Sequence, residues 1–253
     1  MRKSILFVLL GLLVSVTAFM ACGGDDEPSS GVTPQSSKHV AKIITEEGSS
    51  FYESSFTYDS QGRVIKVTET ESGTGTNSHS ETEYQYGEML IISKMKGEGT
   101  YSNGQSFTRT ESHSYTLENG RIVKDEEKQN SSSSTDIFSY DANNYLSSIN
   151  TKMLTWSDGN LIKLGDRSFE YSNYPWVKGL PLYLKGSNMD ANLFAIGYYG
   201  NIPKNLPSKT IASETSGYTY DYTFEGSYVT KVVITPFVEN NKSHKSISTI
   251  IWE

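Results

Sequence analysis

The sequence predicts an all-β protein, an antiparallel β-meander of successive hairpins that forms a strongly curved or barrel-like sheet. Three observations lead to this prediction. From Val40 onward Thr, Ser, Tyr and Val dominate, and apolar residues often alternate with polar ones, which is typical of strands. A short unit of aromatic residues, a turn and branched apolar residues recurs along the chain. A helical period is found only near residues 188–197, where we expect one short helical crossover.

Residues 1–21 are typical of a secretory signal peptide. Arg2 and Lys3 precede an apolar stretch of 15 residues, 5–19, which is shorter than the roughly 20 residues that a permanent membrane helix needs. The stretch is followed closely by Cys22, the only cysteine of the chain. We therefore expect a lipoprotein processing site, with lipid on Cys22 as a stable membrane anchor. The alternative, an ordinary signal peptide, leaves a lone free thiol near the mature N-terminus.

Residues 22–37 are rich in Gly, Ser, Pro and acidic residues, and they predict a lipidated flexible tether before a single all-β domain at 38–253. Removal of residues 1–21 takes two of the 22 basic residues and none of the 29 acidic ones, so the net charge becomes 20 − 29 = −9. A negative chain without a basic stripe excludes nucleic acid as a partner. A lone cysteine also leaves the domain without a disulfide.

The recurring unit predicts a hairpin at each occurrence. Gly or Asn at the turn can adopt φ > 0, and an acidic residue there can bond the local backbone. The aromatic residue before the turn and the branched residue after it are expected to meet across the strand pair. The units lie at 56–66, 115–124, 138–146, 154–163 and 222–231, with a shorter variant at 84–90.

Residues 172–209 are expected to interrupt the meander as a crossover. They hold four of the seven prolines, and proline is excluded from central strands. We expect a short helix around 189–196, with Asn188 or Asp190 as its N-cap.

Several segments resemble a family of uncharacterised Bacteroidetes lipoproteins, a domain of unknown function described as having a porin-like fold. They are the lipoprotein site at Cys22, the hairpin at 58–63, the segments 171–174 and 197–209, and the last hairpin unit. The resemblance implies a twisted, barrel-like antiparallel sheet and no assigned activity. Residues 58–63 also resemble the Tyr-Asp (YD/RHS-type) repeats of large secreted shell-forming proteins.

The acidic residues Asp25, Asp26 and Glu27 resemble the surface-export signal of Bacteroidetes lipoproteins. The alternative is a solvated spacer, because acidic runs are common in disordered segments. With the lipid anchor, the signal predicts an outer-membrane protein exposed at the cell surface. A pore is not expected, since residues 66–72 and 108–114 are polar on both faces of their strands and predict solvated hairpin arms.

Catalytic and metal-binding patterns are weak. The four histidines are scattered, and the nearest approach to a metal site is His113, which has Glu111 on the same strand face. We interpret this pair as part of a solvated strand and expect no metal and no cofactor. The sequence also holds no Gly-x-Ser-x-Gly elbow, so the chain is not expected to be an enzyme.

The aromatic residues of the crossover are the candidate ligand surface. They are Tyr174, Trp176, Tyr183, Tyr198 and Tyr199. Such rings serve either as a binding face or as core that fills a strongly curved sheet. Three hypotheses compete for a lipoprotein of this kind. The first is a non-catalytic surface module that binds a glycan or a protein. The alternative is a periplasm-facing carrier of lipid or another apolar ligand, with an apolar cavity inside the sheet. The third is an enzyme, which predicts a cleft with convergent acidic residues or His113.

Overall fold

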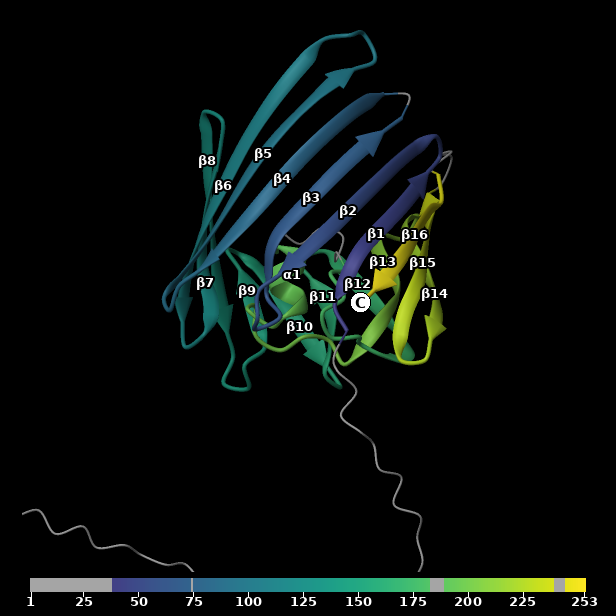
Figure 1. Cartoon of the computed structure of the whole chain (residues 1–253). Coiled ribbons are helices and arrows are strands. Elements are labelled where there is room, and N and C mark those ends of the chain that lie inside the picture. The colour runs from purple at the N-terminus through teal and green to yellow at the C-terminus, as the bar shows by residue number, and fades with distance from the viewer. Residues whose placement is uncertain (1–37, 74, 183–188, 239–243) are drawn as a thin grey trace, which may run out of the picture. The chain divides into compact units, whose positions relative to one another are not determined.

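The computed structural model describes residues 38–73, 75–182, 189–238 and 244–253. Within them, sixteen antiparallel strands close into a barrel with one short helix, which confirms the predicted all-β meander and helical crossover (Figure 1). The strands are β1 (Val40–Glu47), β2 (Ser50–Tyr58), β3 (Val64–Ser72), β4 (Thr76–Tyr86), β5 (Leu90–Tyr101), β6 (Ser106–Glu118), β7 (Arg121–Gln129), β8 (Ser132–Tyr140), β9 (Leu146–Ile149), β10 (Lys152–Ser157), β11 (Asn160–Leu164), β12 (Arg167–Pro175), β13 (Asn205–Ser213), β14 (Ser216–Glu225), β15 (Tyr228–Val238) and β16 (Ser246–Trp252). The helix is α1 (Ala191–Ala195).

Strands that follow one another in the chain are neighbours in the sheet, and β1 pairs with β16 to close it. The two longest strands are β5, with 12 residues, and β6, with 13 residues. Their hairpin and the hairpin β3–β4 rise above the rest of the barrel in Figure 1. Consecutive antiparallel strands need only short turns, which is why a repeated hairpin signal is enough to specify this topology.

The recurring unit forms the hairpins at one end of the barrel, here called the turn end. In four of these hairpins the aromatic residue before the turn pairs with the branched residue after it, as expected: Tyr58 with Val64, Tyr140 with Leu146, Trp156 with Leu161 and Phe224 with Val229. In the hairpin β6–β7 the residue before the turn is Leu117, which pairs with Ile122. A β-bulge adjoins each of these pairs. At the first turn Asp59 Oδ1 accepts hydrogen bonds from the Gln61 and Arg63 amides, which confirms the predicted local role of the acid.

Aromatic side chains at the turn end also tie each hairpin to an earlier one. Each donates a hydrogen bond of 2.6 to 2.8 Å to a backbone carbonyl: Tyr58 to Val40, Tyr86 to Val64, Tyr140 to Ile122, Trp156 to Leu146, Tyr171 to Leu161, Tyr222 to Pro207 and Trp252 to Val229. These rings are half-buried, and their polar atoms are satisfied by groups that the bulges leave accessible. The repeated aromatic position in the sequence is therefore a structural ladder around the barrel.

The helix α1 fills the turn end of the barrel from inside (Figure 1). Leu193 is 0% exposed, and Phe194 packs in the same core cluster as Ile91, Tyr115 and Ile122 of the wall. Asp190 is the N-cap, accepting from the amides of Asn192 and Leu193, so this part of the prediction is confirmed. Asn188, the other candidate cap, lies outside the described residues.

The prediction that all of 172–209 leaves the sheet is wrong. Strand β12 continues to Pro175, and β13 begins at Asn205 and contains Pro207. The register between these strands is irregular on both sides of Tyr171, which pairs with Pro207. At such an irregularity one residue makes no backbone hydrogen bond to the neighbouring strand. Proline, which lacks the donating N–H, is therefore tolerated there.

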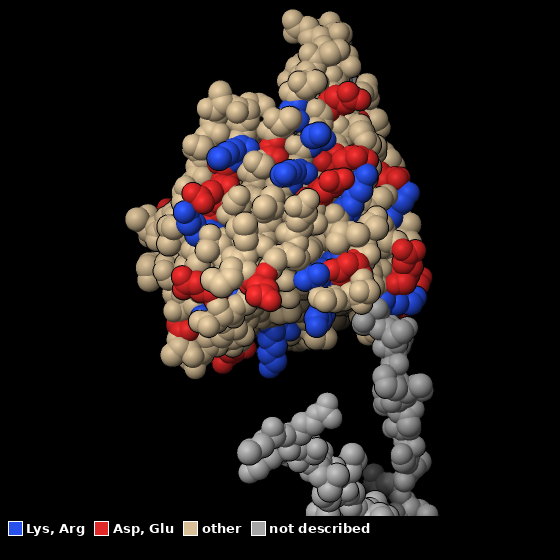
Figure 2. Space-filling model, turned by 60° about the vertical axis from the view of Figure 1, so that its left-hand side comes forward, with Lys and Arg blue, Asp and Glu red and all other residues tan. Residues whose placement is uncertain are grey.

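The outer face of the long hairpins is charged. On β5, Lys94, Lys96 and Glu98 are exposed and alternate with the less exposed Met95 and Gly97. Figure 2 shows basic and acidic side chains interspersed over the face turned forward. Among the residues that the structure describes, no helix is both long and apolar enough to cross a bilayer.

Candidate functional site

A cavity of about 450 Å³ lies inside the barrel between the strands β2–β6 and Asp190. Asp190 is the N-cap of the helix α1, here called the plug helix because it fills one end of the barrel. Most of the cavity's lining residues lie on the inner face of their strands, because successive side chains of a strand point to opposite faces. On β2 and β3, Tyr52 lies opposite Glu71, and Ser54 lies opposite Glu69. The register therefore places hydroxyl and carboxylate groups together on the inner face.

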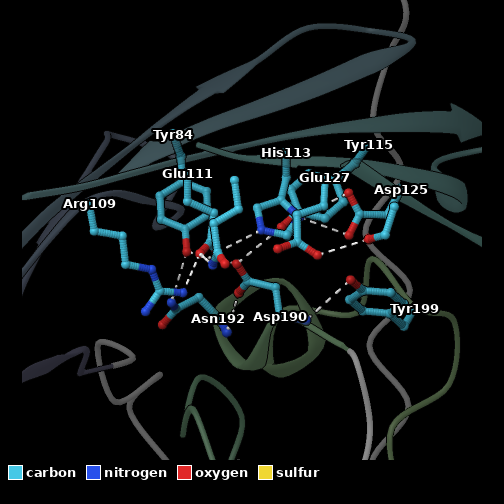
Figure 3. Close-up of polar contacts among 12 residues, drawn as sticks. Tyr84, Arg109, Glu111, His113, Tyr115, Asp125, Glu127, Asp190, Asn192 and Tyr199 are labelled. Carbon is cyan, nitrogen blue, oxygen red and sulfur yellow. Dashed lines mark hydrogen bonds and ion pairs between the residues drawn. The ribbon is translucent and has the colours of Figure 1, made fainter. Parts of the chain in front are cut away.

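The strand β6 contributes the charged centre of the site, drawn in Figure 3. His113 Nδ1 lies 2.9 Å from Asp125 Oδ2, and His113 Nε2 lies 3.0 Å from Glu111 Oε1. Glu127 sits directly across the ladder from His113, and Tyr115 stacks against the imidazole with a centroid distance of 5.4 Å. The histidine is therefore enclosed by three carboxylates and one aromatic ring.

Glu111 is held by further donors. Its Oε2 accepts a hydrogen bond of 2.8 Å from Gln129 Nε2, and the same oxygen forms an ion pair with Arg109 Nη2. The side chain of Glu111 is 19% exposed, and that of Arg109 is 51% exposed. One carboxylate oxygen thus faces the cation of Arg109, while the other faces His113.

The pKa values follow from this environment. Burial disfavours a charged imidazole, but the hydrogen bonds with Asp125 and Glu111 outweigh it and raise the pKa of His113 to about 9. Burial raises the pKa of the Asp125 carboxyl, while the His113 contact acts in the opposite direction. Burial alone would also raise the pKa of Glu111, yet its bonds to His113, Gln129 and Arg109 keep it below the usual value. At neutral pH the imidazole is therefore protonated.

Asp190 connects the plug helix to the cavity wall. Its Oδ2 accepts hydrogen bonds from the Tyr84 hydroxyl at 2.8 Å and the Tyr115 hydroxyl at 3.5 Å. Asn192 Nδ2 donates to the Tyr84 oxygen at 3.1 Å, and the Asp190 amide donates to the Tyr199 oxygen at 3.2 Å. One carboxylate thus caps the helix with one oxygen and holds two wall tyrosines with the other.

Comparison with known proteins supplies the family. The model "Domain of unknown function (DUF4595) with porin-like fold" matches residues 56–233, more than half of the chain. The chain belongs to the DUF4595 family. A crystal structure of a porin-like protein from Bacteroides vulgatus is similar with a TM-score of 0.33 and 12% identity, over 85% of this chain and 99% of that chain. No curated protein matches. The resemblance to a porin-like family is confirmed, whereas that to Tyr-Asp repeats stays a prediction.

The aromatic residues predicted as a ligand surface do not lie on one surface of this DUF4595 domain. Tyr199 is 1% exposed and Trp176 is half-buried, packed edge-on against Phe194, so both belong to the filling of the barrel. Tyr198 is half-buried and stacks on Tyr86 at 5.9 Å. Tyr174, at 50% exposed, leans on Phe224 instead.

The remaining predicted positions are Tyr183, Cys22, Asp25, Asp26 and Glu27, and they lie outside the described residues. Their roles stay predictions.

The prediction that His113 and Glu111 form part of a solvated strand is wrong. Their side chains are only 20% and 19% exposed, because the polar inner face of β6 turns into the closed barrel. Sequence reasoning missed Asp125 and Glu127 altogether, and it named Asp190 only as a helix cap. The available signal was the acidic run 125–127, which directly follows a hairpin unit. Alternate residues of this run point to the same face of the sheet, and the preceding strand carries His113 on that face.

Proposed function

We propose that this chain is an outer-membrane lipoprotein, anchored through Cys22, whose barrel binds a glycan in the cavity between β2–β6 and Asp190. The cavity carries the proposal. Its volume of about 450 Å³ lies in the range of small-molecule sites, roughly 300–1,000 Å³. Carboxylates and hydroxyls accept and exchange hydrogen bonds with sugar hydroxyls, and aromatic rings such as Tyr52 offer an apolar face to a sugar ring.

An apolar ligand fits this cavity poorly. The carrier hypothesis requires an apolar interior, whereas the lining includes Glu69, Glu71, Glu111 and Arg109. Burying such groups against a lipid tail without hydrogen-bond partners is unfavourable by several kcal/mol, on the order of 2–7 for each neutral polar group and more for a charge. We therefore favour a polar ligand over lipid.

A binding role also agrees better than catalysis with the state of His113. A general base must be unprotonated near the working pH, but carboxylates flank both nitrogens of this imidazole. They raise the pKa of His113 to about 9, which keeps it charged and hydrogen-bonded at pH 7. Such a group can orient its neighbours and is not available as a general base.

The anchor and the charged exterior support a location in water beside a membrane. The outer positions Lys94, Lys96 and Glu98 are exposed, and they would be costly in hydrocarbon. Proteinase K added to intact cells is expected to cut the full-length protein as it does in lysed cells. Protection until the outer membrane is broken would instead place the barrel in the periplasm and leave the acidic residues 25–27 as a spacer.

Two adjacent rings on β2 test glycan binding. Tyr52 lines the cavity and is 36% exposed, whereas Phe51 is 38% exposed and is absent from the cavity lining. On a glycan array and then by titration with the best-bound glycan, Tyr52→Ala in the full chain is expected to weaken binding about tenfold, the loss of roughly 1.4 kcal/mol of stacking. Phe51→Ala is expected to bind within about twofold of the wild type. Equal effects of the two changes would contradict a cavity site.

A further inference from the structure

The strands β6 and β7 bring one imidazole and two carboxylates to a single point. Glu111, His113 and Glu127 each offer one ligand atom, and these three atoms all lie within 4.8 Å of one another. All three side chains are half-buried, which distinguishes them from the exposed acidic residues of the barrel surface. Atoms bound to one tetrahedral Zn²⁺ lie roughly 3.5 Å apart, so a small side-chain rotation is enough to complete the set.

The register holds this set in place. His113 and Glu127 are direct cross-strand partners, and Glu111 is two residues along the same face of β6. Neighbours of this kind have Cβ atoms about 4.5–5.5 Å apart when directly opposite, and their side chains leave the sheet in the same direction. The three ligands therefore come from rigid strands and need no loop to fold over an ion.

Asp125 gives this cluster a feature that an ordinary acidic patch lacks. It is 5% exposed and lies 2.9 to 3.0 Å from Nδ1 of His113 with both oxygens. A buried carboxylate at this nitrogen fixes the proton on Nδ1, so that Nε2 is the nitrogen available to a ligand. Nε2 is also the nitrogen that faces Glu111.

We propose that Glu111, His113 and Glu127 bind a divalent transition-metal ion such as Zn²⁺, with Asp125 as the residue that positions the histidine. One imidazole and two carboxylates are a donor set that suits Zn²⁺ better than Ca²⁺ or Mg²⁺, which take oxygen ligands alone. Binding displaces the proton of Nε2 to solvent and involves no redox step. Glu111 and His113 also line the proposed glycan cavity, but the metal site follows from its own ligand geometry and does not rest on glycan binding.

Arg109 limits the geometry of the bound ion. Its guanidinium and Gln129 occupy Oε2 of Glu111, so the ion would use Oε1. Its positive charge also opposes a second cation nearby. Arg109→Gln, which removes this charge from a half-exposed position, is therefore expected to tighten metal binding severalfold.

The test is calorimetric titration of the full chain, freed of metal with a chelator, with ZnCl₂. The wild type is expected to bind one ion saturably. Glu127→Gln and His113→Asn are each expected to weaken binding at least tenfold, and Asp125→Asn to weaken it about 10–100-fold through the histidine. Glu126→Gln is the matched control, because Glu126 is exposed, pairs with Lys124 and lies between Asp125 and Glu127 in the sequence. Thermal unfolding of each variant shows whether it is folded.

Two outcomes would overturn the proposal: no saturable binding by the wild type, or equal binding by the Glu126→Gln and Glu127→Gln variants. A free thiol at Cys22 is the other group that could bind the metal, and a Co²⁺ titration distinguishes it from the proposed site. The proposed site predicts d–d bands of a nitrogen and oxygen site that vanish in Glu127→Gln. A thiolate charge-transfer band that persists in that variant would assign the ion to Cys22 instead.

Discussion

Replacing Asp190 with alanine is expected to lower the free energy of unfolding by about 3 kcal/mol. The change removes the N-cap of α1, for which the usual cost is about 1 kcal/mol. It also removes the acceptor of the Tyr84 hydroxyl, which lies 2.8 Å from Asp190, and of the Tyr115 hydroxyl. Both tyrosines are buried, at 7% and 1% exposed, so the loss of the carboxylate removes a charged acceptor from two buried hydroxyls.

Urea unfolding of the full chain, followed by tryptophan fluorescence, measures this loss. The control is Asp190→Asn, because asparagine caps helices as well as aspartate and its carbonyl oxygen still accepts from Tyr84. That variant is expected to lose about 1 kcal/mol, the difference between a charged and a neutral acceptor. If alanine and asparagine at this position are equally stable, Asp190 does not hold the plug to the wall.

Leu193→Ala is expected to lower the free energy of unfolding by a similar amount, about 2–5 kcal/mol. Leu193 is 0% exposed and packs in the cluster that joins α1 to the barrel wall. Truncation removes three carbon atoms and leaves a void, since sixteen hydrogen-bonded strands cannot move inward independently to fill it.

The control for this second change is Met153→Ala, a truncation on β10 at a position that is 65% exposed. Its effect is expected to stay within about 0.5 kcal/mol. The midpoint of urea unfolding checks both variants. A Leu193→Ala barrel as stable as the Met153→Ala barrel would mean that the helix rests in the lumen without supporting the wall.

The hairpins could be predicted from the sequence because their determinants are local. Tyr58 and Val64 are six residues apart, and the turn between them carries Gly62 with φ of 74° and Asp59 as a backbone acceptor. Such signals lie within one short window and do not depend on the rest of the chain. These signals specify each hairpin but not the number of strands in the sheet or its closure. The fold class was therefore predicted, and the strand number was not.

The charged centre could not be predicted because a bulge decides it. Counting back from the turn, Leu117 pairs with Ile122, and an unbroken ladder would then pair His113 with Glu126. The bulge between Thr116 and Leu117 shifts the register by one residue. This shift turns Asp125 and Glu127 to the face of His113, and Glu126 to the outside. A pattern of alternating residues does not reveal where such a shift falls.

Asp190 illustrates a second limit, the contact between distant parts of the chain. It is 106 residues from Tyr84, and the crossover that carries it enters the barrel only because the wall closes around it. The sequence signal at Asp190 was a helix cap, which was confirmed, while its hold on the wall tyrosines required the tertiary structure. Local reasoning identified the residue and one of its two roles.

The seam between β1 and β16 has a consequence for how the protein folds. It joins residues such as Thr45 and Ser248, which are 203 positions apart along the chain, whereas each of the other neighbouring strand pairs in the described barrel is consecutive. Loop-closure entropy makes so remote a pairing late and slow, and until it forms both strands keep open edges with unpaired amides and carbonyls. Such edges pair readily with those of another molecule. Aggregation during folding is therefore expected to begin at these two strands, and variants that weaken the pairing of β1 with β16 should aggregate first.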